Sequence, residues 1–112
     1  MSNLGANMQA EDRDKFRKTN GLMLRVVINS VPTSWFKVGE LKSAMKEAKA
    51  NSNDVAFSLS YLEDAGYIQA RLVETRENIS SSDFDEDLIE LKLTAEGKKV
   101  IMGFLQDVAV EI

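Results

Sequence analysis

The fold is decided by a stretch in the middle of the chain, SNDVAFSLSYLEDAG at residues 52–66. Within it, Val55, Leu59 and Leu62 are separated by four and three residues, which is the spacing of side chains on one face of a helix. We therefore expect an amphipathic helix that is buried along this face. The rest of the chain is expected to support or present this helix.

Both ends of the predicted helix carry residues that are typical of helix termini. We expect Ser52 or Asn53 to cap its start, because a short polar side chain accepts a hydrogen bond from a free N–H group of the first turn. Gly66 is expected to end it, since glycine adopts the left-handed backbone conformation without a steric penalty. The helix therefore has a predicted beginning and a predicted end.

Two further helices are predicted before this stretch. Apolar residues recur with helical spacing from Asp12 onward, and Pro32 ends the run, with Gly21 as a weak point inside the helix. An extended piece that starts at Ser34 or Trp35 and ends at Lys37 comes next. The second helix then follows from apolar residues at spacings of three, four and three, Val38, Leu41, Met45 and Ala48.

A hairpin and a closing helix are predicted after Gly66. Residues 68–73 and 88–93 alternate apolar and polar side chains, which is typical of strands with one buried face. Residues 78–87 are rich in serine and aspartate and are expected to form a long loop at the hairpin tip. Thr94 and Gly97 open a last helix, expected to run to about Leu105 with an apolar face of Val100, Ile101, Phe104, Leu105 and Val108.

Length and composition indicate a single domain without catalytic equipment. The 112 residues suit one hydrophobic core, which we place at residues 12–112 after a flexible polar tail at residues 1–11. The chain has no cysteine and no histidine, which removes the commonest metal ligands and general bases. It also has no glycine-rich phosphate loop. We therefore expect no enzyme activity, no metal and no cofactor. Because no signal peptide or apolar membrane span is visible, a cytoplasmic location is expected.

Charge is divided unevenly along the chain. Residues 1–50 carry nine basic and five acidic side chains, whereas residues 51–112 carry five basic and thirteen acidic ones. The halves therefore have net charges of +4 and −8, within a total of −4. A nucleic acid would have to bind the first half, since the second half repels phosphate.

Two motifs give the chain a resemblance to known regulators. The segment LSYLEDAGYI at residues 59–68 resembles the recognition helix and its exit in MarR-, PadR- and ArsR-type proteins, and LTAEG at residues 93–97 resembles the entry to their next helix. This resemblance implies an α+β winged helix-turn-helix fold. Such a fold has a three-helix core, a two-stranded β-hairpin wing and a C-terminal helix. A looser resemblance, through GLMLRVV at residues 21–27 and the short tail after Gly103, is to small winged-helix proteins of Mu-like phages and prophages.

The winged-helix resemblance assigns the central helix to base contacts. In such regulators this helix enters the major groove of DNA while the second helix crosses the phosphate backbone. Carried over, the residues that face the bases are Asn53, Asp54, Phe57, Ser58 and Tyr61. This chain departs from the pattern because that face has no Lys or Arg. Phe57 and Tyr61 have two alternatives: they anchor a partner protein or pack on a base, or one of them, more readily Tyr61, folds back into the core under the wing.

Phosphate contacts are expected from the lysines of the second helix. Lys42, Lys46 and Lys49 recur along one face, and Lys37 lies just before it; Arg13, Arg17 and Lys18 are expected to help. The alternative is an ordinary solvated helix face, because lysine is common on exposed helices. These residues and the base-facing set are the candidate site.

The predicted wing is too acidic for DNA. Against Arg76 alone, it carries seven acidic residues, Glu74, Glu77, Asp83, Asp85, Glu86, Asp87 and Glu90. Phosphate repels such a loop, so we expect the wing to stay away from a duplex. The alternative use for it is contact with a basic protein.

These patterns predict a DNA-binding transcriptional regulator that acts as a homodimer on double-stranded DNA. Many winged-helix regulators dimerise through their terminal helices, and here those helices carry apolar residues beyond the needs of a small core, Leu22, Leu24, Phe104 and Leu105. The alternative function is a protein–protein interaction module, encoded by a phage or prophage, with an acidic wing.

Overall fold

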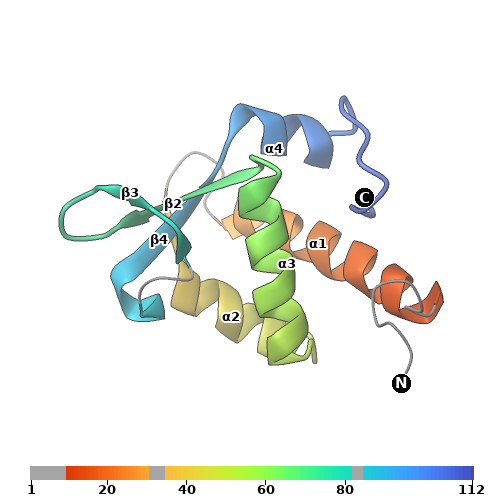
Figure 1. The fold of residues 1–112 in the computed structure, drawn as a ribbon, viewed down its shortest axis with the longest axis horizontal. Helices are drawn as coiled ribbons and strands as arrows, with labels where there is room; N and C mark the ends of the chain where they lie inside the picture. Colours follow the sequence, from red (N-terminus) through yellow and green to blue (C-terminus); the bar gives the residue numbers. More distant parts are fainter. Residues whose placement is uncertain (1–9, 31–34, 82–84) are drawn as a thin grey trace, which may run out of the picture.

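The computed structural model describes residues 10–30, 35–81 and 85–112 (Figure 1). In this part of the chain the elements are α1 (Ala10–Ser30), β1 (Phe36–Lys37), α2 (Val38–Glu47), α3 (Ser52–Asp64), β2 (Ile68–Leu72), β3 (Asn78–Ile79), the 3-10 helix η2 (Glu86–Leu88), β4 (Ile89–Leu93) and α4 (Ala95–Ile101). The predicted α+β class is confirmed. No helix of the described ranges is both long and apolar enough to cross a bilayer.

The first helix begins earlier than predicted. It starts at Ala10, so residues 10 and 11 belong to α1 rather than to the expected tail. Residues 1–9 and Pro32 lie outside the described residues. α1 runs behind α3 (Figure 1) and buries Met23, Leu24 and Val27 in the core. Because Leu24 is fully buried, it closes the core of its own chain and is not available to a second copy.

The central helix has the predicted buried face but a different cap. Val55, Leu59 and Leu62 are buried, as their spacing predicts. The cap is Asn51, whose side chain accepts a 2.8 Å hydrogen bond from the Asn53 N–H. Ser52 and Asn53 were predicted wrongly for this role, because both are already in helical conformation and only Asn51 has the extended backbone that a cap requires. Gly66 follows the helix with φ +81°, in agreement with its predicted role as terminator.

The hairpin is part of a four-stranded antiparallel sheet within the described residues, in the order β1-β4-β2-β3. β2 and β4 pair along their whole length, from Ile68 opposite Leu93 to Leu72 opposite Ile89. The inner side chains of β4, Ile89, Leu91 and Leu93, are buried as predicted. The expected loop at residues 78–87 also contains β3, which pairs with β2, and most of η2.

The last helix is shorter than predicted. Thr94 caps it, since its hydroxyl accepts a 3.0 Å hydrogen bond from the Gly97 N–H. The helix ends at Ile101 rather than near Leu105, and Gly103, with φ +84°, turns the chain. As a result Phe104 and Val108, predicted on the apolar face, are 82% and 88% exposed.

The chain then returns to α1 as an irregular segment, residues 102–112, which we call the C-terminal segment. The Glu111 N–H donates to the Arg17 carbonyl at 3.0 Å, and the Asn20 amide donates to the Ala109 carbonyl at 2.8 Å. A Cβ added to Gly21 would lie 1.7 Å from the Glu111 carbonyl oxygen. Gly21 is therefore the point at which the C-terminal segment approaches the helix backbone.

Candidate functional site

The predicted lysines lie on α2 and on the turn that joins it to α3. Lys37 precedes α2 and is exposed, and Lys46 and Lys49 are exposed at the far end. Lys49 has φ +65°, a left-handed conformation that turns the chain between the two helices. None of these three makes an ion pair with another described residue.

Lys42 differs from the other three. Its ammonium group lies 3.1 Å from the carboxylate of Glu86, at the start of η2. Both side chains border a hollow of about 650 Å³, lined by Gly39, Lys42, Ser43, Lys46, Ala50, Ser52, Val55 and Glu86. The structure thus brings α2, the start of α3 and the connection between β2 and β4 together around one hollow.

A second group of cations comes from the start of α1. Lys15, Lys18 and Lys49 border a smaller hollow of about 240 Å³, which also touches Asn51 and Asp54. Lys15 lies 3.1 Å from Asp54 and Lys18 lies 3.0 Å from Asp14. The hydrogen bond and charge of Asp14 raise the pKa of Lys18. Sequence reasoning missed Lys15, because 39 positions separate it from Asp54 and no local pattern connects them.

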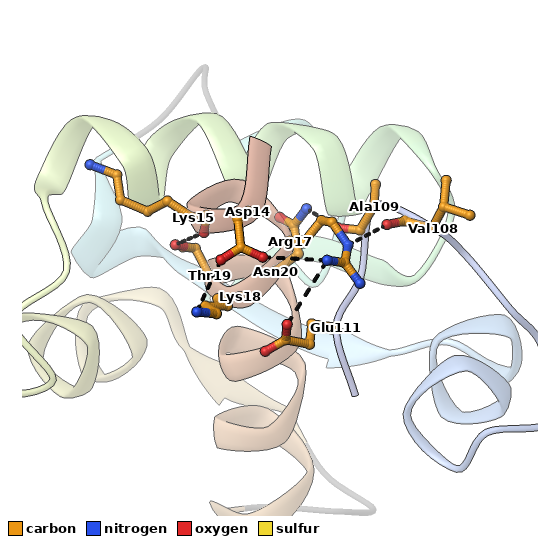
Figure 2. A network of polar contacts seen from close by, with 9 residues as sticks. All are labelled: Asp14, Lys15, Arg17, Lys18, Thr19, Asn20, Val108, Ala109 and Glu111. Atoms are coloured by element: carbon orange, nitrogen blue, oxygen red, sulfur yellow. Dashed lines mark hydrogen bonds and ion pairs between the residues drawn. The ribbon is translucent and has the colours of Figure 1, made fainter. Parts of the chain in front are cut away.

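Arg17 does not join this group. Its Nε donates to the Val108 carbonyl at 2.8 Å, and its Nη1 lies 3.4 Å from Asp14 (Figure 2). Its guanidinium is also 4.0 Å from Glu111. The Arg17 side chain therefore holds the C-terminal segment against α1, and its phosphate-binding role stays a prediction.

Two of the five predicted base-facing residues remain open on α3. Asn53 is exposed, and Phe57 is 61% exposed. Asp54 is held by Lys15. Ser58 is fully buried, so its predicted contact with bases is wrong; it lies three residues after Val55 and four before Leu62, on the face that packs inward.

Tyr61 folds back, which was the favoured alternative in the sequence. Its ring packs edge-on against Phe16, at 5.2 Å between centroids. Its hydroxyl donates to Asp107 at 2.5 Å, and the Tyr67 hydroxyl donates to the same carboxylate oxygen at 2.6 Å. Tyr61 is therefore bonded to the C-terminal segment. The sequence had instead predicted a position under the hairpin.

The pKa values of Tyr61, Tyr67 and Asp107 are all shifted at this shared carboxylate. Burial, reinforced by the hydrogen bond and charge of Asp107, raises the pKa of Tyr61 to about 12 and raises that of Tyr67 as well. Burial alone would raise the pKa of Asp107, but hydrogen bonds from both hydroxyls and from the Ala109 N–H together lower it. At neutral pH the site therefore consists of two neutral phenols and one carboxylate.

Two acidic residues of the hairpin lie beside the predicted lysines: Glu86 and Asp87 share a hollow with Lys37, and Glu86 also borders the hollow of Lys42 and Lys46. Glu74, Glu77, Asp85 and Asp87 are exposed, and Asp83 lies outside the described residues. Glu90 is half-buried and lies 2.5 Å from Arg71, whose guanidinium also covers the Trp35 ring at 3.8 Å. Lys42–Glu86 is the ion pair that joins α2 to the connection between β2 and β4, among the described residues.

Comparison of the chain with family models, curated proteins and solved structures finds no match. The winged-helix resemblance therefore stays a prediction that depends on motifs and on the order of elements. The homodimer also stays a prediction. Of the residues expected to support it, Leu24 is buried, Leu22 and Leu105 pack partly against the core, and Phe104 is exposed.

Proposed function

We propose that the chain is a winged helix-turn-helix protein that binds double-stranded DNA and regulates transcription. The order of elements supports this proposal: three helices, a β2–β4 hairpin and a closing helix, with a short turn between α2 and α3. In the proposed arrangement α2 lies along the phosphate backbone, the start of α3 points into the major groove, and the part of the acidic wing that carries Glu74 and Glu77 is directed away from the duplex.

The observation that carries the proposal is the position of the unpaired lysines. Lys46 is exposed in the last turn of α2 and Lys49 is exposed within the tight turn that leads into α3, and the Asn51-capped start of α3 follows directly. A phosphate group here meets the exposed Lys46 and Lys49 ammonium groups, which form no ion pair with a carboxylate of the described residues. Phosphate contacts of this kind supply most of the affinity of a DNA-binding domain for any sequence.

Base reading is limited in this proposal. Asn53 is an exposed amide at the start of α3, and such an amide can donate to and accept from an adenine edge. Phe57 offers an apolar surface to a thymine methyl group. Because Ser58 and Tyr61 are turned inward, sequence preference would be modest and affinity would depend strongly on salt.

A titration of a random-sequence duplex at several salt concentrations tests the proposal. The double variant Lys46→Gln/Lys49→Gln should weaken binding and lower the slope of log K against log salt by about 1.8, since each lost phosphate contact removes roughly 0.9. The matched control is Lys98→Gln/Lys99→Gln on α4, which removes the same charge and should retain most of the slope. An unchanged slope in the first variant would contradict the proposal.

A second candidate is a protein-interaction module. It is favoured by the outward face of α3, which has no cation, and by the exposed acids of the hairpin. In this case the wild-type chain shows no duplex binding even at low salt. It instead captures a basic protein, and neutralising Glu74, Glu77, Asp85 and Asp87 together abolishes the capture.

A further inference from the structure

Four of the eight residues that line the hollow between α2 and α3 have side chains that donate hydrogen bonds. Its polar rim consists of the Lys42 and Lys46 ammonium groups and the Ser43 and Ser52 side chains, and its apolar lining comes from Ala50 and Val55. Glu86 brings the one carboxylate into this set. A cavity with two ammonium groups and two hydroxyls has the chemistry of an anion site.

Glu86 enters the hollow from another part of the chain. It belongs to η2, in the connection between β2 and β4, and its Oε2 lies 3.1 Å from the Lys42 Nζ. The side chains of Lys42 and Glu86 are 41% and 47% exposed, so water screens their attraction and the pair contributes little. The carboxylate is therefore an anion of the chain itself, held weakly enough to be exchanged.

The neighbouring hollow provides a contrast. It has about 710 Å³ and is lined by Lys37 and four acidic residues, Glu40, Glu47, Glu86 and Asp87. An anion is repelled there. The balance of donors and carboxylates thus distinguishes two adjoining hollows on α2, which share Gly39, Ser43 and Glu86.

We propose that the first hollow is a seat for a phosphodiester group and that Glu86 occupies it until DNA displaces the carboxylate. The incoming phosphate replaces one carboxylate contact by contacts to Lys42, Lys46 and the two serines. Glu86 thus weakens binding of the free protein to any polyanion and acts as an internal competitor. That the phosphate belongs to DNA depends on the proposed function. The seat itself depends only on the residues that line the hollow.

Competition predicts a specific result for Glu86→Gln. This variant should bind a random duplex about two- to fivefold more tightly than the wild type, the range that an exposed ion pair represents. The matched control is Glu77→Gln, an exposed acid of the same hairpin with the same change in net charge, which should give a clearly smaller gain. In a Lys42→Gln background the gain from Glu86→Gln should disappear, because the two residues act as one pair.

Titration with inorganic phosphate, followed by amide NMR, tests the seat without DNA. The Ser43 and Ser52 amides should shift in Glu86→Gln at lower phosphate concentration than in the wild type. Equal duplex affinities of Glu86→Gln and Glu77→Gln, with the Lys46→Gln/Lys49→Gln effect intact, would overturn the seat and leave the proposed function standing. Phosphate shifts at Ser43 and Ser52 without any duplex binding would support the seat and overturn DNA as its ligand.

Discussion

The C-terminal segment and the hairpin both lie on the helical body, but they are attached to it differently. The C-terminal segment makes directed hydrogen bonds to α1: the Glu111 N–H to the Arg17 carbonyl, the Arg17 Nε to the Val108 carbonyl, and the Asn20 amide to the Ala109 carbonyl (Figure 2). Its Asp107 carboxylate also accepts from two tyrosines of the body. It is built into the fold although it has no regular secondary structure.

The strands of the hairpin, β2 and β4, pack on the core through buried apolar side chains, whereas Ser81 and Glu86, in the segment that connects them, meet α3 and α2 through polar and charged side chains near water. Lys42 pairs with Glu86, and the Glu63 carboxylate of α3 accepts from the Ser81 N–H at 3.0 Å and from its hydroxyl. Its own strands pair regularly, so its structure does not depend on these contacts. The difference teaches that the C-terminal segment is held by several directed hydrogen bonds, whereas the exposed Lys42–Glu86 pair, which water screens, is the contact that a ligand exchanges at least cost.

The largest expected effect comes from closing the space beside Gly21. Ala is favoured over Gly in a helix by about 1 kcal/mol, so Gly21→Ala would normally stabilise α1. Here the new Cβ meets the Glu111 backbone at 1.7 Å, and we expect a net loss of about 2–3 kcal/mol in the free energy of unfolding. Urea denaturation measures it. The control is Gly39→Ala, whose Cβ meets only the Asp87 carboxylate at 3.7 Å; a similar response of both variants would contradict the close approach.

A smaller loss is expected from Asp107→Asn. Tyr61 and Tyr67 would each donate to a neutral amide oxygen instead of a carboxylate. Because hydrogen bonds to charged groups are the stronger ones, the expected loss at pH 7 is about 2 kcal/mol. Urea denaturation checks it, with the exposed Asp64→Asn as control. If the two variants have the same stability, the two tyrosines do not depend on the charge of Asp107.

The same site predicts a pH dependence. The pKa of Asp107 is lowered in the folded chain, so its contribution is present above the ordinary aspartate value of about 3.9 and is lost as pH falls through the lowered value. The pKa of Tyr61 is raised to about 12, so its contribution is lost as pH rises from about 10 toward that value. The stability gap between the wild type and Asp107→Asn should therefore narrow in acid and in strong alkali. A gap that stays constant would contradict the assignment.

Local signals in the sequence predicted much of the fold. The spacing of Val55, Leu59 and Leu62 located α3 and its buried face, and the alternation at residues 89–93 located the inner side of β4. Gly66 and Thr94 marked helix ends through their own backbone and side-chain chemistry. Each of these features depends on residues within one helix or strand, which is what a single sequence can show.

Contacts between distant residues could not be predicted in this way. Glycine is required at position 21 because the Glu111 backbone, 90 positions away, approaches the helix there. The Tyr61 side chain is turned inward because its hydroxyl bonds to Asp107, 46 positions away. Lys42 was placed correctly on α2, but its partner Glu86 had been assigned to a loop and to a repelled wing. Ser58 is the exception, because its spacing from Val55 and Leu62 already indicated the buried face.

The smallest expected losses in the free energy of unfolding come from two ion pairs of the hairpin, which should differ in strength. Glu90 and Arg71 form a close pair of 2.5 Å whose side chains are only 14% and 21% exposed, and Arg71 also covers the Trp35 ring. Glu90→Gln leaves a half-buried guanidinium without its carboxylate, so we expect a loss of about 1.5 kcal/mol in the free energy of unfolding. Glu86→Gln breaks a pair that water screens and should cost at most about 0.5 kcal/mol. Urea denaturation of both variants measures the difference. Equal losses would show that the Lys42–Glu86 pair is as firmly held as the Arg71–Glu90 pair of the sheet. The physical reason for an exchangeable Glu86 carboxylate would then be gone.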